Sequence, residues 1–294
     1  MKDQPKIAYL GGEPLGAPTL EVLCECGLSP ALVVCSPDRP SGRGLTVTPP
    51  PVKTVASSKG ISVLQPENLK DQTALAPLLT EDWDLFVVVA YNHILPKWLI
   101  EHPKHGTINL HPSLLPKLRG PSPIRTAILE DNRDAVGVSV MLMDEEMDHG
   151  PLLATEQVIV PTDEWPLSGT VLDKLLTEEG ARLLADTIPL WLAGSLVPQE
   201  QDHERATYTK KLTRADGELL LDPFSPPSGT AAYELLCKIR AFAGWPSTYF
   251  FADGKRIKIT EVELADDGSL KLLRVIPEGK KEMDFAAYRD SLGA

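Results

Sequence analysis

The chain has 294 residues, 43% of them hydrophobic and 24% charged, a profile typical of a globular protein with one large or two modest domains. No apolar run reaches the ~18 residues of a membrane-spanning helix, and Met1–Pro5 lacks the basic and apolar regions of a secretory signal, so we expect a cytoplasmic protein with no membrane partner. The net charge of −12 excludes a generic nucleic-acid binder, but Lys and Arg balance Asp and Glu over residues 207–294, where a local basic surface is possible.

Short apolar runs alternate with helical patterns over the first two thirds of the chain. Six runs predict strands, at Ile7–Leu10, Ala31–Cys35, Ile61–Leu64, Leu85–Ala90, Thr107–Leu110 and Val136–Met143. Helices are predicted over Gly16–Cys26, Val52–Lys59 and Gly169–Leu192. Buried strands separated by helices indicate β-α-β units around a mainly parallel sheet. The predicted fold class is therefore α/β, with a doubly wound, Rossmann-like sheet.

A second domain is predicted after a polar linker. The expected boundaries are 1–194 for the first domain, 195–206 for the linker and 207–294 for the second domain. A helix is expected over Ser228–Phe242, followed by strands at Tyr249–Ala252, Arg256–Leu264 and Leu270–Val275. Several short strands in so few residues favour a small β-barrel or sandwich, with little room beyond one long hairpin.

The strongest local motif is Asn109–Pro116, followed by Arg119-Gly120-Pro121. Asn109 and His111 are two residues apart at the end of a predicted strand, so their side chains share a face. Pro112 has no backbone N–H for a sheet ladder, and the strand is expected to stop there. Both polar groups are then expected at the carboxyl edge of the sheet, where open α/β folds bind ligands.

A second motif, Met143–Gly150, follows the sixth predicted strand and is expected to begin at the same edge. Its Asp148, two residues before the flexible Gly150, could approach His111 and favour the imidazolium form of that ring. An amide, an imidazole and a carboxylate together can stabilise the oxyanion of a tetrahedral intermediate and transfer its protons. Taken separately, an N-x-H motif and a lone Asp are more common as structural or turn residues.

Other sites are disfavoured by spacing. The cysteines, at positions 24, 26, 35 and 237, form no C-x-x-C pair, and the histidines lack metal-ligand spacing, so no metal is expected. Gly11, Gly12 and Gly16 do not match the G-x-G-x-x-G dinucleotide fingerprint. The long loop 36–52 is the other unusual feature, because loops of that length in compact domains are usually functional or disordered.

The chain resembles the methionyl-tRNA formyltransferases, a branch of the folate-dependent formyltransferases, from near its N-terminus to about Lys281. The N-x-H, S-L-L-P and D-x-G motifs, at Asn109–Pro116 and Asp148–Gly150, are those shared by folate-dependent formyltransferases. The blocks that point to the tRNA branch are Pro37–Gly44, Thr207-Tyr208 with Lys211-Leu212, Ile239–Phe242 and Trp245-Pro246.

The resemblance implies formyl transfer from 10-formyltetrahydrofolate to the α-amine of methionyl initiator tRNA, with no metal. Asn109, His111 and Asp148 would be catalytic. Residues Tyr91, Leu95, Ser113, Leu114, Leu115 and Pro116 would bind folate, with backbone of Tyr91–Leu95 and Glu145–Asp148 holding the pteridine. Arg43, Lys210 and Lys211 would contact the tRNA, the second domain would be an OB-like barrel that holds it, and the enzyme would be a monomer.

The chain departs from the family pattern at Asn92-His93, inside the segment implied to hold the pteridine. Three alternatives remain at this point. A formyltransferase acting on an amino sugar nucleotide or on glycinamide ribonucleotide would keep Asn109, His111 and Asp148. A tRNA- or folate-binding module would not need all three, and a dinucleotide-dependent reductase lacks its glycine fingerprint.

Overall fold

The computed structural model describes residues 4–41 and 45–292. They form two compact units, each built from several stretches of the chain. The first unit contains residues up to 120, 135–159 and 173–208, and the second contains 121–134, 160–172 and 209 onward.

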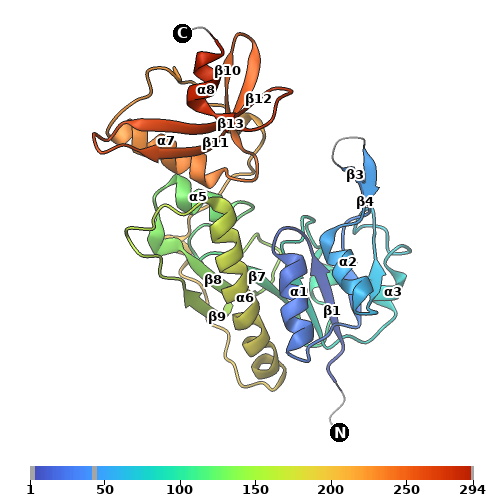
Figure 1. Cartoon of the computed structure of the whole chain (residues 1–294). Coiled ribbons are helices and arrows are strands. Elements are labelled where there is room, and N and C mark those ends of the chain that lie inside the picture. The colour runs from blue at the N-terminus through green and yellow to red at the C-terminus, as the bar shows by residue number, and fades with distance from the viewer. Residues whose placement is uncertain (1–3, 42–44, 293–294) are drawn as a thin grey trace. The chain divides into compact units, whose positions relative to one another are not determined.

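The first unit is built on a seven-stranded sheet in the order β5-β2-β1-β6-β7-β8-β9 (Figure 1). The strands are β1 (Ile7–Gly11), β2 (Leu32–Val34), β5 (Ser62–Leu64), β6 (Leu85–Val89), β7 (Thr107–His111), β8 (Gly137–Leu142) and β9 (Leu152–Gln157). All neighbouring pairs from β5 to β7 are parallel, while β8 is antiparallel to both β7 and β9. The helices are α1 (Gly16–Glu25), α2 (Pro51–Ser58), α3 (Ala76–Leu79), α4 (Lys97–Ile100) and most of α6 (Gly169–Leu192). The predicted α/β class with a mainly parallel sheet is therefore confirmed.

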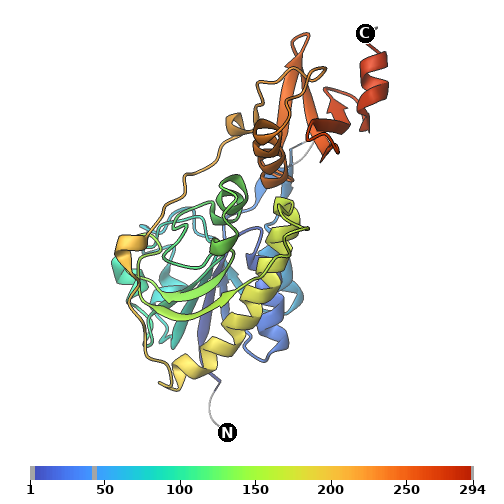
Figure 2. The ribbon, with the colours of Figure 1, turned by 90° about the vertical axis from the view of Figure 1, so that its left-hand side faces the viewer.

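The central strands are apolar because both of their faces are covered. Every residue of β1 and β6 is buried, as expected for the interior of a parallel sheet. On β7 and β8, helix α6 covers one face, since a Cβ atom on Gly180 would lie 3.0 Å from Leu110 and 3.3 Å from Val138. Figure 2 shows α6 running alongside the strands. Because side chains alternate along a strand, Asn109 and His111 point to the face opposite α6.

The direction of β8 corrects one expectation. The segment after β8 was expected to begin at the carboxyl edge of β7, but β8 is antiparallel, and Met143 donates its N–H to the Thr107 carbonyl, 2.8 Å away, at the opposite end of β7. The expectation was wrong because a buried apolar run carries no information on strand direction. The loop 143–151 therefore starts far from His111 along the strand, and only its later residues return to it.

The long loop 36–52 contains a short hairpin that the sequence did not predict, formed by β3 (Arg39–Ser41) and β4 (Thr46–Thr48). Its base is fixed by Lys53, which contacts the Asp38 carboxylate at 2.7 Å and the Gln65 side-chain oxygen at 2.8 Å. Hydrogen bonds from Lys53 and Gln65 hold the pKa of Asp38 below its usual value. Arg43, predicted to contact tRNA, lies outside the described residues.

The second unit contains a four-stranded antiparallel sheet in the order β10-β11-β12-β13. Its elements are α5 (Pro123–Leu129), α7 (Thr230–Ala241), β10 (Thr248–Ala252), β11 (Lys255–Leu264), β12 (Leu270–Pro277), β13 (Met283–Asp284) and α8 (Phe285–Asp290). Leu236 of α7 packs with Phe250 and Ile257 in its core. The predicted helix and three strands are confirmed, and β13 and α8 were not predicted.

Candidate active site

Strand β7 carries the two polar residues of the N-x-H motif. His111 is 4% exposed and Asn109 is half-buried, between Val88 of β6 and Met141 of β8 in the sheet register. Within 4–41 and 45–292, the side-chain amide of Asn109 makes no hydrogen bond with protein. An amide held on a packed strand without a partner can donate to a ligand oxygen at no cost in broken protein bonds.

Each nitrogen of the His111 ring faces an oxygen atom. Nε2 lies 3.0 Å from the Leu118 carbonyl oxygen, and Nδ1 lies 3.6 Å from Oδ1 of Asp148. A carbonyl oxygen only accepts, so Nε2 carries a hydrogen in this arrangement. An ionised carboxylate also only accepts, so a hydrogen bond from Nδ1 to Asp148 would need a hydrogen on Nδ1. At 3.6 Å, the approach of Nδ1 to Asp148 is too long for a full hydrogen bond.

Asp148 is held by the loop after β7 and by the backbone conformation of its own loop. Its Oδ2 accepts the Gly120 N–H at 2.7 Å, which leaves Oδ1 to face His111. Its backbone has φ of +52°, in the left-handed region that costs energy for residues other than Gly. Two residues on, a Cβ atom at Gly150 would lie 2.0 Å from the Leu142 carbonyl oxygen, so the D-x-G motif needs Gly at its last position.

The turn after β7 is held by Ser139 of β8 and by a hydrogen bond of its own. Ser139 Oγ donates to the Ser113 carbonyl at 2.7 Å and accepts the Leu115 N–H at 3.1 Å. The Ser113 hydroxyl donates to the Lys117 carbonyl at 2.6 Å, and both Ser113 and Leu115 are buried. The S-L-L-P motif thus builds the turn that places the Leu118 carbonyl against His111.

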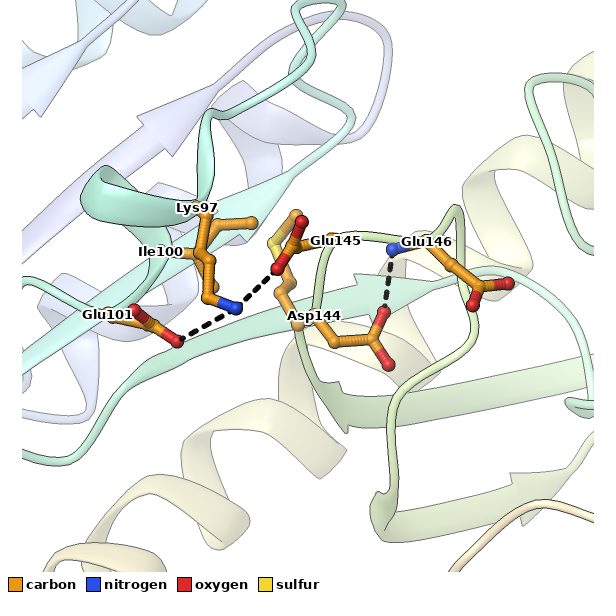
Figure 3. A pocket seen from close by; sticks show the side chains of 7 residues that line it. Lys97, Ile100, Glu101, Asp144, Glu145 and Glu146 are labelled. Atoms are coloured by element: carbon orange, nitrogen blue, oxygen red, sulfur yellow. Dashed lines mark hydrogen bonds and ion pairs between the residues drawn. The ribbon is translucent and has the colours of Figure 1, made fainter.

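A cavity of about 420 Å³ lies between α4 and the loop after β8 (Figure 3). Its lining comprises Lys97, Ile100, Glu101, Met143, Asp144, Glu145 and Glu146. The Lys97 ammonium is 2.5 Å from Glu145 and 3.9 Å from Glu101, and these carboxylates, Glu145 first, raise the pKa of Lys97. Of the two segments whose backbone was expected to hold the pteridine, Glu145–Asp148 contributes Glu145 and Glu146 to this lining, and Tyr91–Leu95 contributes none.

The remaining predicted residues differ in their surroundings. Leu95 is buried in the apolar core with Tyr91 packed against that core, and burial raises the pKa of the Tyr91 hydroxyl. That hydroxyl oxygen is buried and makes no hydrogen bond within the part of the chain that the structure describes.

In the second unit, Lys210 is exposed and lies 3.6 Å from Asp216, and Lys211 is also exposed.

Arg119 and Gln201 also contribute to the site, although the sequence did not place them there. Arg119 is 1% exposed, and its guanidinium donates twice to Gln201 Oε1, at 2.8 and 3.2 Å. The Gln201 amide in turn donates to the Asp148 carbonyl at 3.0 Å and to the Gly150 carbonyl at 2.8 Å. Arg119 was noted as part of a motif, but Gln201 was predicted to lie in the linker, and its sequence neighbours give no sign of burial.

Neither a metal site nor a membrane span emerges from the described residues. No group of three or more His, Cys, Asp and Glu side chains in 4–41 and 45–292 could hold a metal ion. No helix in those ranges is both long and apolar enough to cross a membrane.

Asn109 and His111 share one face of the mainly parallel sheet, and Asp148 approaches His111 from a loop; comparison with known proteins shows the family to which a chain of this fold belongs. The chain belongs to the formyl transferase family: the family model described as "Formyl transferase" matches residues 7–187, and that of its C-terminal domain matches residues 230–268.

Curated relatives match nearly the whole chain. The methionyl-tRNA formyltransferase of Bacillus licheniformis is 37% identical, covering 95% of this chain and 92% of its own length. The methionyl-tRNA formyltransferase of a Geobacillus species is 36% identical, covering 98% of this chain and 95% of its own.

Solved structures share the fold at lower identity. A 4-N formyltransferase from Francisella tularensis has a TM-score of 0.67 at 18% identity, covering 88% of this chain and 97% of its own. HypX from Aquifex aeolicus, solved in complex with tetrahydrofolic acid, has a TM-score of 0.64 at 14% identity, covering 97% of this chain and 47% of its own.

Proposed function

We propose that this protein transfers the formyl group of 10-formyltetrahydrofolate to the α-amine of methionyl initiator tRNA. The relatives at 35–37% identity that cover most of the chain carry the name of that enzyme, which supports the tRNA acceptor. The observation that carries the chemistry is the approach of His111 Nδ1 to Asp148 Oδ1, at 3.6 Å, on the sheet face that also holds Asn109.

In the proposed mechanism, the amine attacks the formyl carbon and negative charge develops on the formyl oxygen. The Asn109 amide N–H and the His111 Nδ1–H donate to that oxygen. Asp148 keeps the proton on His111 and accepts the amine proton through water. The carbon–N10 bond then breaks, and N10 of the folate takes up one proton. No covalent bond to the enzyme forms.

The folate is proposed to bind beside this site. Its pteridine would be held by backbone of Tyr91–Leu95 and Glu145–Asp148, next to the cavity that Lys97 and Glu145 line. One observation supports the fit: the Tyr91 hydroxyl is a buried polar group without a protein partner among the described residues. Leu95 and Ser113–Pro116 would shape the walls, with backbone groups offering the polar contacts because the Ser113 hydroxyl donates to the Lys117 carbonyl.

The tRNA is proposed to contact Arg43, Lys210 and Lys211, and a monomer is expected to bind it. The outward face of β10 supports a nucleic-acid contact in the second unit, because Phe251 is 54% exposed and the Arg256 guanidinium lies 5.4 Å from the Tyr249 ring centre. Aromatic rings with arginine are the groups on which unpaired bases stack.

The test compares acceptors. Purified protein with 10-formyltetrahydrofolate is offered charged initiator tRNA, an amino sugar nucleotide or glycinamide ribonucleotide, and the products are identified by mass spectrometry. Formylmethionine released from the tRNA supports the proposal. If another acceptor is formylated and the tRNA is not, the proposed acceptor is wrong and that other one takes its place. Binding of tRNA and folate without any formylated product would indicate a binding module.

A further inference from the structure

The segment between α6 and the second unit returns to the active-site loops. Gln201 is 4% exposed, although polar, exposed residues surround it in sequence. Its side-chain nitrogen donates to the carbonyls of Asp148 and Gly150, and its side-chain oxygen accepts two guanidinium N–H groups of Arg119. All four hydrogen-bonding positions of the amide are therefore used.

Arg119 fixes the orientation of that amide. Its buried guanidinium has no carboxylate within ion-pair distance in 4–41 and 45–292, and its other contacts are His203 Nδ1 at 2.9 Å and the Tyr208 hydroxyl at 3.4 Å. A guanidinium only donates, so the oxygen of Gln201 must face it and the NH₂ group must face the two carbonyls. Arg119 thus orients the NH₂ group of Gln201 toward the loop that carries Asp148.

The same segment holds the other active-site loop through Thr207. The Thr207 hydroxyl accepts the Leu118 N–H at 2.8 Å, and its carbonyl accepts the Arg119 N–H, also at 2.8 Å. Thr207 in turn donates its N–H to the Pro116 carbonyl at 3.2 Å. Leu118 supplies the carbonyl that binds His111, and Gly120, two residues on, supplies the N–H that binds Asp148.

We propose that Gln201–Tyr208 is a clamp that sets the distance between His111 and Asp148, with Gln201 and Thr207 as positioning residues. The formyl transfer that the clamp would serve is the proposed function, on which its catalytic consequence rests. Neither residue contacts His111 or the Asp148 carboxylate directly. Each holds the backbone of one of the two loops, so the segment joins the two partners of the pair.

The backbone at Asp148 explains why a clamp is needed. A left-handed conformation at a residue other than Gly is costly and persists only where the surroundings enforce it. Without the Gln201 donors, the carbonyls of residues 148 and 150 would lose their protein partners and the loop could relax. Small displacements are sufficient to matter, since a shift of about 1 Å at a reacting group can cost about 10²-fold in rate.

The first test replaces Gln201 by Leu, which keeps the volume and removes the amide. Q201L is expected to lower kcat by about 10²-fold, because the loop that carries Asp148 loses the two hydrogen bonds from Gln201. Q199L is the matched control: Gln199 is exposed in the same segment and pairs with Leu152 only through backbone groups. Equal kcat in wild type, Q199L and Q201L would overturn the role of Gln201.

The second test uses the hydroxyl of Thr207. T207V keeps the shape but loses the acceptor for the Leu118 N–H, whereas T207S keeps it. We expect kcat to fall in T207V and to recover in T207S. If Q201L does not fold, as judged by circular dichroism, this pair decides the proposal, and equal rates in T207V and T207S would overturn it.

A measurement without substrate separates the clamp from the proposed function. The ring resonances of His111 in NMR spectra report on Asp148, and D148N defines the shift that loss of this carboxylate produces. Q201L is expected to move the resonances toward the D148N position while Q199L leaves them unchanged. If wild type forms no formylmethionine but Q201L moves the His111 resonances, the proposed function fails and the clamp stands. If Q201L leaves them at their wild-type position, the clamp fails.

Discussion

Gly120 donates its backbone N–H to one oxygen of Asp148 at 2.7 Å, and the other oxygen faces His111 at 3.6 Å. One carboxylate therefore connects the loop after β7 with the loop after β8. The bond to Gly120 fixes which oxygen faces His111, and the approach of that oxygen to His111 is longer than a full hydrogen bond. Several consequences of this arrangement can be measured.

Replacing Asp148 by Asn keeps the shape and the bond from Gly120 but removes the negative charge that faces His111. We expect kcat to fall by about 10²–10⁴-fold, the range for loss of acid–base assistance. Steady-state kinetics with the folding of D148N checked by circular dichroism measures this. A rate within a few-fold of wild type would remove Asp148 from the mechanism.

Replacing Asn109 by Ala removes a donor that has no protein partner in the described residues. Stability should therefore change little, while the single-turnover rate should fall by about 10²–10³-fold, as for loss of one oxyanion donor. Thermal unfolding and rapid-quench measurements on the same preparation separate the two effects. A large loss of stability without a loss of rate would show that Asn109 is structural.

Replacing Gly150 by Ala would place a Cβ atom 2.0 Å from the Leu142 carbonyl oxygen, so the backbone has to move. We expect both the melting temperature and the formylation rate to fall. V197A is a suitable control, because Val197 is 82% exposed in the same unit. An unchanged melting temperature in G150A would contradict the close packing of this turn.

Replacing Lys211 by Ala should weaken tRNA binding and reduce the slope of log affinity against log salt concentration by about one, as for one lost phosphate contact. K59A is the control: it replaces an exposed lysine at the C-terminal end of α2 and should leave that slope unchanged. Titrations at several salt concentrations measure both. Equal slopes for K211A and wild type would exclude a phosphate contact at this position.

Cysteine labelling tests the packing of the first unit. Burial is the main cause that raises the pKa of Cys35 to about 11, so at neutral pH this thiol is both inaccessible and protonated. Cys26 is exposed. Mass spectrometry after brief alkylation should find Cys26 modified and Cys35 modified only after unfolding. Equally fast labelling of both in the folded protein would contradict the packing around β2.

The sequence predicted much of the first unit because its strands are continuous apolar runs and its helices have clear periodicity. The helix over Gly169–Leu192 is found with the predicted bounds. The exposed strand β9 was missed, since its residues are mostly partly buried or exposed and carry no apolar run. The expectation that depended on the direction of β8 was wrong, because side chains alternate along a strand in the same way whichever direction it runs.

The candidate site was predictable where motifs lie on one element and not where it depends on tertiary contacts. Asn109 and His111 share a face through simple alternation on β7. The approach of Asp148 to His111 was a hypothesis from the combination of residue types, and its distance could come only from the structure. Gln201 could not be predicted, because its burial results from Arg119, a residue 82 positions earlier in the chain.

The central claim is that His111, held by Asp148, stabilises the oxyanion formed during formyl transfer. It is tested most directly by the single-turnover rate of H111A with 10-formyltetrahydrofolate and charged initiator tRNA, at saturating concentrations of both. The account predicts a fall of at least about 10²-fold with tRNA binding retained and with no formyl group trapped on the wild-type protein. A wild-type rate in H111A, or a formyl-enzyme captured by quenching, would contradict it.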